Sequence, residues 1–210
     1  MKNELDILGS TPVSSATIAS LYPKLSCANQ KVNQLEKAEA IIRLKRGMYV
    51  VNPEFSGVPV STELIANHLY SPSYVSMHTA LRWYGIIPER VAVTQSMTIK
   101  HSRAFVNHFG LFEYTCVDRH YFPIGLRNEE SGESSFIIAS PEKALCDLIR
   151  ETTGLNLRYV KEAQAFLEED LRLDMDAFKS FNKEILRQCA AEGYKKKGSI
   201  QTLLKLFARL

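Results

Sequence analysis

Hydrophobic positions in the first 25 residues recur at helical spacing and predict two short helices. One lies around residues 5–8. The other covers 16–22, where Ser14 or Ser15 can cap the first turn and Pro23 stops the last. Both are amphipathic, so we expect them to pack against whatever follows in the chain.

A third helix and a ribbon follow directly. Residues 28, 32 and 35 are apolar and share one face of a helix over 26–37, which Ser26 can cap. The run 40–51 then predicts two strands joined at Arg46-Gly47, because glycine supplies the positive φ of a tight hairpin turn. Helix, helix, turn, helix and two-stranded ribbon is the order of a winged helix-turn-helix.

Proline and glycine around Gly57 interrupt these patterns, and we predict a domain boundary there. The predicted units are a winged helix-turn-helix over 1–57 and a sheet-and-helix domain over 58–210, which is helical from about 151. Beyond the boundary, the chain has β-branched and aromatic runs typical of a mainly antiparallel sheet. The predicted helices are 61–69, 74–84, one opened by Ser140-Pro141-Glu142, 160–169, 176–190 and 199–210; the predicted strands are 91–98, 103–107, 111–117 and 134–138. The fold class is therefore α+β.

The composition of the 210 residues is that of a globular protein, with 45% hydrophobic and 23% charged residues. No run approaches the roughly 18 apolar residues that a spanning helix needs, and acids stand where a signal peptide has an apolar core. The four cysteines are far apart and form no C-x-x-C pair. We expect a cytoplasmic protein with no membrane partner, no cofactor and no structural metal.

The net charge of +3 is unevenly distributed. Between residues 24 and 46 there are six Lys or Arg against two acids, and this excess coincides with the third helix and the ribbon. A helix fits the DNA major groove, where Asn and Gln can form paired hydrogen bonds to adenine while Lys and Arg neutralise phosphates. The predicted DNA-binding residues are Ser26, Asn29, Gln30, Lys31, Asn33, Gln34, Lys37, Arg43, Lys45 and Arg46. The alternative is a solvated helix face or a protein-docking module.

A second basic run, formed by Lys195, Lys196 and Lys197, precedes an amphipathic stretch over 200–210. These lysines can bind an acidic partner, the DNA backbone or a membrane surface. The simpler interpretation, which we favour, is a terminal helix that closes the core and leaves its lysines solvated.

Catalytic motifs for nucleotide binding, metalloprotease or serine hydrolase chemistry are absent from the sequence. The nearest catalytic cluster is Asp118-Arg119-His120, with His101 and Arg103 on a neighbouring predicted strand. These residues leave a metal-dependent nuclease as an alternative, although such positions are more often solvated loops.

Four segments occur together in an order that resembles the AbiEi-type antitoxins of bacterial abortive-infection systems. They are RLKRGMYVV, SPSYVSMHTALRWYGIIPERV, SRAFVNHFGLFEY and IASPEKALCDLI, and the resemblance covers about residues 15–150. It implies an N-terminal winged helix that represses its own toxin-antitoxin operon, with Ser26 to Lys37 as the DNA-reading helix and Lys45-Arg46 as the wing. It also implies a C-terminal domain that counters a nucleotidyltransferase-like toxin, with or without direct contact.

Within this resemblance, the middle and later segments supply residues to which the sequence assigns packing or capping but no chemistry. They are Tyr74, Ser76, His78, Thr79, Leu81, Tyr84 and Gly85, and then Ser140, Pro141, Glu142, Lys143 and Asp147. We therefore expect a sequence-specific repressor that binds inverted repeats in operator DNA and also acts as an antitoxin. The alternative is a stand-alone transcription factor whose second domain senses a ligand or mediates assembly.

Overall fold

The N-terminal unit combines three helical segments with a small antiparallel sheet in the computed structural model, which describes residues 4–25, 28–89, 92–132 and 134–210. Its elements are η1 (Glu4–Leu8), β1 (Val13–Ser14), α1 (Ser15–Ser20), α2 (Ala28–Lys37), β2 (Ile41–Lys45) and β3 (Met48–Val51). The strands pair in the order β1-β3-β2. The predicted helices and ribbon are confirmed in type and place: Ser14 caps α1, and Gly47 takes a φ of 76° in the turn between β2 and β3. The predicted cap Ser26 lies outside the described residues.

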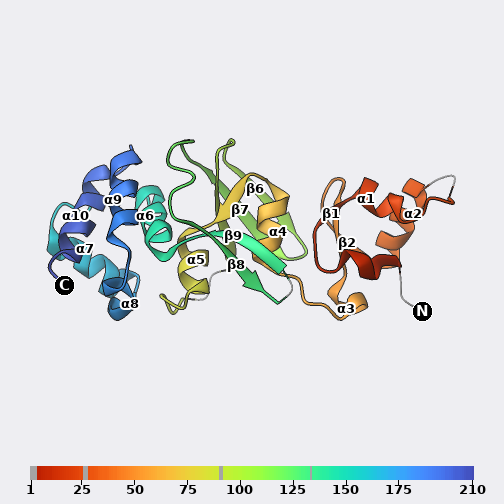
Figure 1. Cartoon of the computed structure of the whole chain (residues 1–210), viewed down its shortest axis with the longest axis horizontal. Coiled ribbons are helices and arrows are strands. Elements are labelled where there is room, and N and C mark those ends of the chain that lie inside the picture. Colours follow the sequence, from red (N-terminus) through yellow and green to blue (C-terminus); the bar gives the residue numbers. More distant parts are fainter. Residues whose placement is uncertain (1–3, 26–27, 90–91, 133) are drawn as a thin grey trace.

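The second unit is built on a six-stranded sheet in the order β6-β7-β5-β4-β9-β8, and α3 (Pro53–Ser56) and α4 (Thr62–Leu69) lead into it (Figure 1). The strands are β4 (Ser73–Val75), β5 (Val93–Thr98), β6 (Arg103–Asn107), β7 (Gly110–Cys116), β8 (Leu126–Ser131) and β9 (Ser134–Ala139). The α+β class is confirmed. The sheet is mixed rather than mainly antiparallel, because β5 runs parallel to β7 and β4 runs parallel to β9.

Two parts of this sheet differ from the sequence prediction. The predicted helix over 74–84 is instead strand β4 followed by α5 (Met77–Trp83). All three residues of β4 are buried between β5 and β9, so the segment has no alternation that would distinguish a strand from a buried helix. Strand β8 was not predicted, since its sequence LRNEES is polar, as is common on a sheet edge.

Helices cover both faces of the sheet. Tyr114 donates its hydroxyl hydrogen bond to the Ala66 carbonyl of α4, whereas Tyr74 donates to Asp147 of α6 (Pro141–Glu151). Tyr114 pairs with Ser96 and Tyr74 with Met97, and neighbouring residues of a strand point to opposite faces. Helix α4 therefore lies on one face and α6 on the other.

Short helices form the end of the molecule that is opposite the N-terminal unit (Figure 1). They are α7 (Val160–Ala165), the π-helical turn η2 (Phe166–Asp170), α8 (Met175–Lys179), α9 (Lys183–Glu192) and α10 (Lys197–Phe207). The prediction of a single helix over 176–190 is wrong. The segment forms the two helices α8 and α9, and α9 begins after Asn182, whose side chain caps it. In the described part of the chain, no helix is long and apolar enough to cross a membrane.

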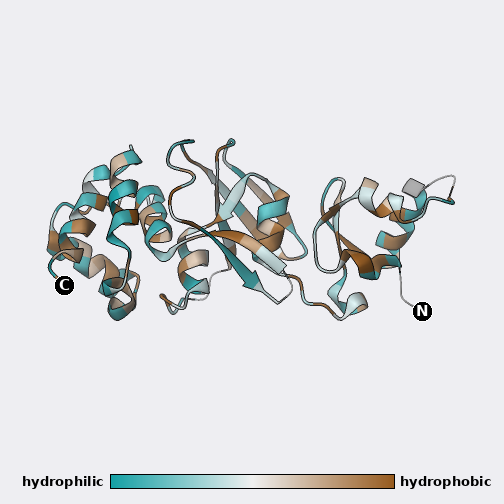
Figure 2. Cartoon of the chain, viewed as in Figure 1, coloured by the Kyte–Doolittle hydropathy of each residue, from teal (hydrophilic) through white to brown (hydrophobic). Residues whose placement is uncertain are grey.

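The ribbon formed by β2 and β3 belongs to two hydrophobic cores. Ile41 and Val51 pack with Ile18 and Val32 in the core of the N-terminal unit. Leu44 and Val50 instead join the large core of the second unit, on which the sheet and its helices are built. Figure 2 shows the hydrophobic ribbon and central strands in brown. The ribbon contributes buried side chains to both cores, which fixes the two units against each other.

Candidate nucleic-acid interface

Helix α2 presents a polar face to solvent. Gln30, Asn33, Gln34 and Lys37 are exposed, whereas Val32 on the opposite side is buried in the core of the N-terminal unit. Asn29 lies in the first turn of α2, and its side chain is outside the described part of the structure. The exposed face thus carries amide groups that can donate and accept hydrogen bonds, next to a cation.

Two cations beside this face are held by neighbouring rings. The Lys31 ammonium lies 5.2 Å from the centre of the Tyr22 ring. The Arg43 guanidinium lies 5.6 Å from the centre of the Tyr49 ring and donates a 2.5 Å hydrogen bond to Glu36 of α2. That hydrogen bond raises the pKa of Arg43 above its ordinary value, and the nearby Tyr49 and Glu36 charges act in the same direction. Arg43 therefore ties the ribbon to α2 rather than standing free.

The two basic residues of the ribbon turn have different positions. Arg46 is exposed at the tip, as expected. Lys45 turns toward the second unit instead: its ammonium donates to the carbonyl of Leu69, the last residue of α4, at 2.5 Å. Burial lowers the pKa of Lys45, and the charges of Lys100 and Arg103 lower it further. The expectation that Lys45 extends from the tip is corrected, because an ammonium at a helix C-terminus satisfies a carbonyl that the helix leaves unpaired.

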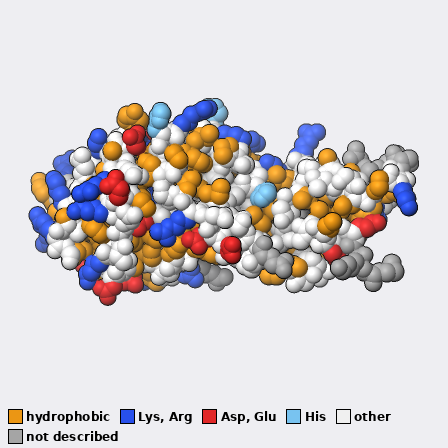
Figure 3. Space-filling view, in the orientation of Figure 1, with side chains coloured by type: hydrophobic (Ala, Val, Ile, Leu, Met, Phe, Trp, Pro, Cys, Tyr) orange, Lys and Arg blue, Asp and Glu red, His pale blue; other side chains and the backbone are white. Residues whose placement is uncertain are grey.

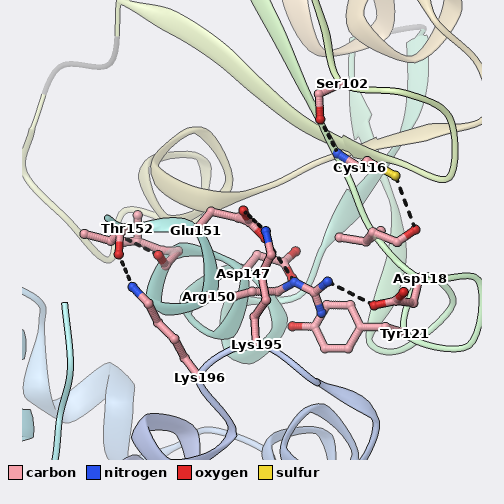
Figure 4. Close-up of polar contacts among 12 residues, drawn as sticks. Ser102, Cys116, Asp118, Tyr121, Asp147, Arg150, Glu151, Thr152, Lys195 and Lys196 are labelled. Atoms are coloured by element: carbon pink, nitrogen blue, oxygen red, sulfur yellow. Dashed lines mark hydrogen bonds and ion pairs between the residues drawn. The ribbon is translucent and has the colours of Figure 1, made fainter. Parts of the chain in front are cut away.

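The lysines at 195–197 are also partly engaged within the chain (Figure 4). The Lys195 ammonium is 3.0 Å from Glu151, and Lys196 donates to the carbonyl of Thr152 at the end of α6. Lys197 is exposed in the first turn of α10. Two of these three residues thus hold the start of α10 against the end of α6, so Lys195 and Lys196 are bonded within the chain, whereas the favoured interpretation had all three lysines solvated.

The residues considered for nuclease chemistry are all exposed, and Asp118 is bonded to a residue outside that set. Asp118 accepts a hydrogen bond from Arg150 at 3.0 Å (Figure 4). Arg119 and His120 are exposed. Arg150 also forms an ion pair with Glu151. Burial lowers the pKa of Arg150, but Asp118 and Glu151 raise it more, so this pKa lies above its ordinary value. Within the residues that the structure describes, no three His, Cys, Asp or Glu side chains lie close enough to hold a metal ion.

The structure brings together a buried polar cluster that sequence reasoning missed. The Lys143 ammonium lies 3.3 Å from Asp147, and both side chains are fully buried. Tyr74 and Ser76 donate hydrogen bonds to the same carboxylate, at 3.1 and 2.6 Å. Lys143 also donates to the Tyr121 carbonyl and lies over the Tyr121 ring, which Arg150 contacts as well.

Burial explains the chemistry of this cluster. The pKa of Tyr74 is raised well above its ordinary value, mainly by burial and then by the Asp147 charge, so the phenol stays protonated and can donate. The available signal in the sequence was a Lys and an Asp four residues apart in a predicted helix, which places them on the same face. The cluster joins the two sequence segments around residues 74–85 and 140–147, and its hydrogen bonds hold α6 against β4.

No protein-family model matches this chain, and no curated protein matches it significantly.

Proposed function

We propose that this chain is a sequence-specific DNA-binding regulator whose N-terminal unit is a winged helix-turn-helix. The order η1, β1, α1, α2, β2, β3 and the sheet order β1-β3-β2 support this proposal. In this arrangement α2 is the helix that enters the major groove, and the ribbon turn is a short wing.

The observation that carries the proposal is the exposed face of α2 next to the exposed ribbon tip. Gln30, Asn33 and Gln34 offer side-chain amides, which suit adenine edges in the major groove. Lys37 and Arg46 flank them as exposed cations, which suit phosphates. A solvated helix face would need neither this composition nor an adjacent cationic turn.

The resemblance to AbiEi-type antitoxins supports a more specific role. We assign the chain as a repressor of its own operon and as the antitoxin of a nucleotidyltransferase-like toxin. A single N-terminal unit offers one short reading helix, so two copies on an inverted repeat account best for selective binding.

The test of DNA reading is selection of bound sequences from a random duplex pool. We expect Asn33→Ala and Gln30→Ala to relax preference at one or two base pairs each, at roughly 1–3 kcal/mol per paired contact. Arg46→Ala should weaken all sequences about equally and reduce the salt slope by about 0.9. Gln201→Ala, an exposed glutamine of α10, is the control. A wild-type protein that enriches no sequence overturns the proposal.

The antitoxin role is tested in two steps: a search of the adjacent genes for a nucleotidyltransferase-like reading frame, and co-expression of this chain with the protein that such a frame encodes. We expect growth to be restored by the wild type and also by the Asn33→Ala, Arg46→Ala double variant, because protection is assigned to the second unit. If the double variant, which has lost DNA binding, also fails to restore growth, the chain acts only as a repressor. Failure of the wild type to protect would leave a stand-alone transcription factor.

A further inference from the structure

Strand β8 forms one edge of the six-stranded sheet. It pairs with β9, and in the described part of the chain no strand lies on its outer side. Its sequence is LRNEES, and Asn128 and Glu130 are exposed to solvent. A strand at a sheet edge presents N–H and C=O groups to which another chain can bind. The proposed function in the N-terminal unit does not use these residues.

The hydrogen bonds between β8 and β9 determine which backbone groups point outward. Opposed residues of an antiparallel pair alternate between pairs that exchange hydrogen bonds and pairs that do not. The Ser140 amide donates to the Gly125 carbonyl at 2.7 Å, so these two residues form a pair of the first kind. Arg127 and Glu129 follow at intervals of two residues, and their N–H and C=O groups therefore point toward β9.

The side chain of Asn67 in α4 leads to the same conclusion. It accepts from the Ile137 amide at 2.5 Å and donates to the Ile137 carbonyl at 3.1 Å, so these backbone groups point away from β8. Asn128 is opposite Ile137, and its own N–H and C=O therefore point to the outer edge, as do those of Leu126 and Glu130. Within the described residues, the backbone groups of these three residues form no hydrogen bond to another segment.

The side chains along this edge include one unpaired charge of each sign. Arg127 and Glu129 are two residues apart, so they lie on the same face of the sheet. The Tyr84 hydroxyl donates to Glu129 at 3.2 Å, and the Arg127 guanidinium lies 5.8 Å from the centre of the Tyr84 ring. Neither charge forms an ion pair within the part of the chain that the structure describes. Figure 3 shows basic and acidic side chains close together near the centre of the view, where β8 lies in Figure 1.

A second copy of β8 complements both the backbone groups and the charges. Two identical strands pair in antiparallel fashion when a twofold axis relates them. An axis at Asn128 places Arg127 opposite the partner's Glu129, and the same contact occurs again on the other side of the axis. In this register Asn128 exchanges hydrogen bonds with the partner's Asn128, and Leu126 with the partner's Glu130. These are the residues whose backbone groups point outward.

The neighbouring registers are less favourable. An axis at Arg127 places two arginines opposite each other, and an axis at Glu129 does the same with two glutamates. Like charges directly opposite each other on paired strands are destabilising, whereas opposite charges stabilise the pair. Charged side chains often prevent an edge strand from pairing with another copy, but the order of charges in β8 favours such pairing in one register.

We propose that the β8 edge is an interface between two copies of this chain, which pair about a twofold axis at Asn128 and join their sheets. A second copy fits better than an unrelated extended peptide, because it supplies the opposite charge on both sides of the axis. One pair of strands is a small interface, so we expect a reversible dimer in the micromolar range of concentration. The interface does not depend on DNA binding, although its twofold symmetry matches that of an inverted repeat.

The test is sedimentation velocity of the full-length protein without DNA, over a range of concentrations. We expect the wild type to change from monomer to dimer as its concentration rises. Arg127→Glu and Glu129→Lys each place like charges opposite one another on both sides of the axis, and each should weaken the dimer by about tenfold. An equimolar mixture of these two variants should form a heterodimer at least as tight as the wild-type dimer, because every charge then faces an opposite one.

Two further variants separate the interface from general effects of charge and folding. Glu130→Lys reverses a charge on the same strand, but this residue faces the partner's Leu126, so the dimer should be close to that of the wild type. Asn128→Pro removes an outward N–H, and proline is tolerated at such edge positions. This variant should remain folded and lose the dimer. Thermal unfolding of each variant confirms that it is folded.

Each outcome has a distinct meaning. A wild type that dimerises but binds no DNA supports the interface and overturns the proposed function. A wild type that remains a monomer at every concentration overturns the interface, and loss of protection by the β8 variants in the co-expression test would then reassign this edge to the toxin. A dimer that Asn128→Pro and the charge variants leave unchanged also overturns the interface, because another surface then joins the two copies.

Discussion

Lys143 and Asp147 form an ion pair one turn apart on α6, although neither side chain is exposed to solvent. Removal of one partner leaves an uncompensated charge in the core. We expect Lys143→Met to lower the free energy of unfolding by about 3–5 kcal/mol. The double variant Lys143→Met, Asp147→Leu should lose less than the sum of the two single variants. Urea unfolding measures all three.

The matched control is Lys161→Met, which changes an exposed lysine of α7. Surface substitutions of this kind are usually within about 0.5 kcal/mol. Equal losses for Lys143→Met and Lys161→Met would show that the buried pair contributes nothing measurable.

Gly125 combines a left-handed backbone with close packing. Its φ is 58°, and a Cβ would lie 2.9 Å from Ile185, 3.0 Å from Ser140 and 3.1 Å from Lys143. Gly154 has a similar φ of 78° with open space around it. Gly154→Ala should therefore cost only the backbone strain, about 1–2 kcal/mol. Gly125→Ala should cost about 1–3 kcal/mol more because of overpacking. Similar melting temperatures for the two variants would rule out tight packing at Gly125.

Leu44 tests whether the ribbon fastens the two units together. Its side chain is 3% exposed in the core of the second unit. Leu44→Ala should lower the free energy of unfolding by about 2–5 kcal/mol. Ile7→Ala changes a side chain that is 80% exposed and serves as the control. A fragment of residues 1–57 exposes Leu44 and Val50, so we expect it to self-associate in sedimentation experiments. A monomeric fragment, or a neutral Leu44→Ala, would show that the units are independent.

His68 of α4 gives a pH dependence. Burial lowers its pKa below the ordinary 6.5. As the pH falls below 6.5, the unfolded chain takes up a proton that the folded protein does not. The free energy of unfolding therefore decreases as the pH falls below 6.5, and it stops decreasing once the pH is below the pKa of His68 in the folded protein. The urea midpoint of His68→Gln should depend less on pH in this window than that of the wild type. The control variant His120→Gln changes an exposed position, and its urea midpoint should follow that of the wild type. Identical profiles for wild type and His68→Gln would contradict this assignment.

Short-range signals predicted much of the candidate interface and of the fold. Helix α2, the Gly47 turn and the Ser140 cap of α6 depend on residues within about four positions of each other, so the sequence was sufficient to place them. The exposed amide face of α2 followed from the same periodicity.

Only the tertiary structure decided which charged residues are free. Lys45 bonds to a carbonyl 24 residues away and Lys195 to a carboxylate 44 residues away, whereas Arg46, next to Lys45, remains exposed. The β4 strand and the Tyr74–Asp147 bond, which spans 73 residues, depend in the same way on distant segments. Composition and spacing describe a residue and its near neighbours along the chain, but the burial and partner of a charge are determined by the segments that folding places beside it.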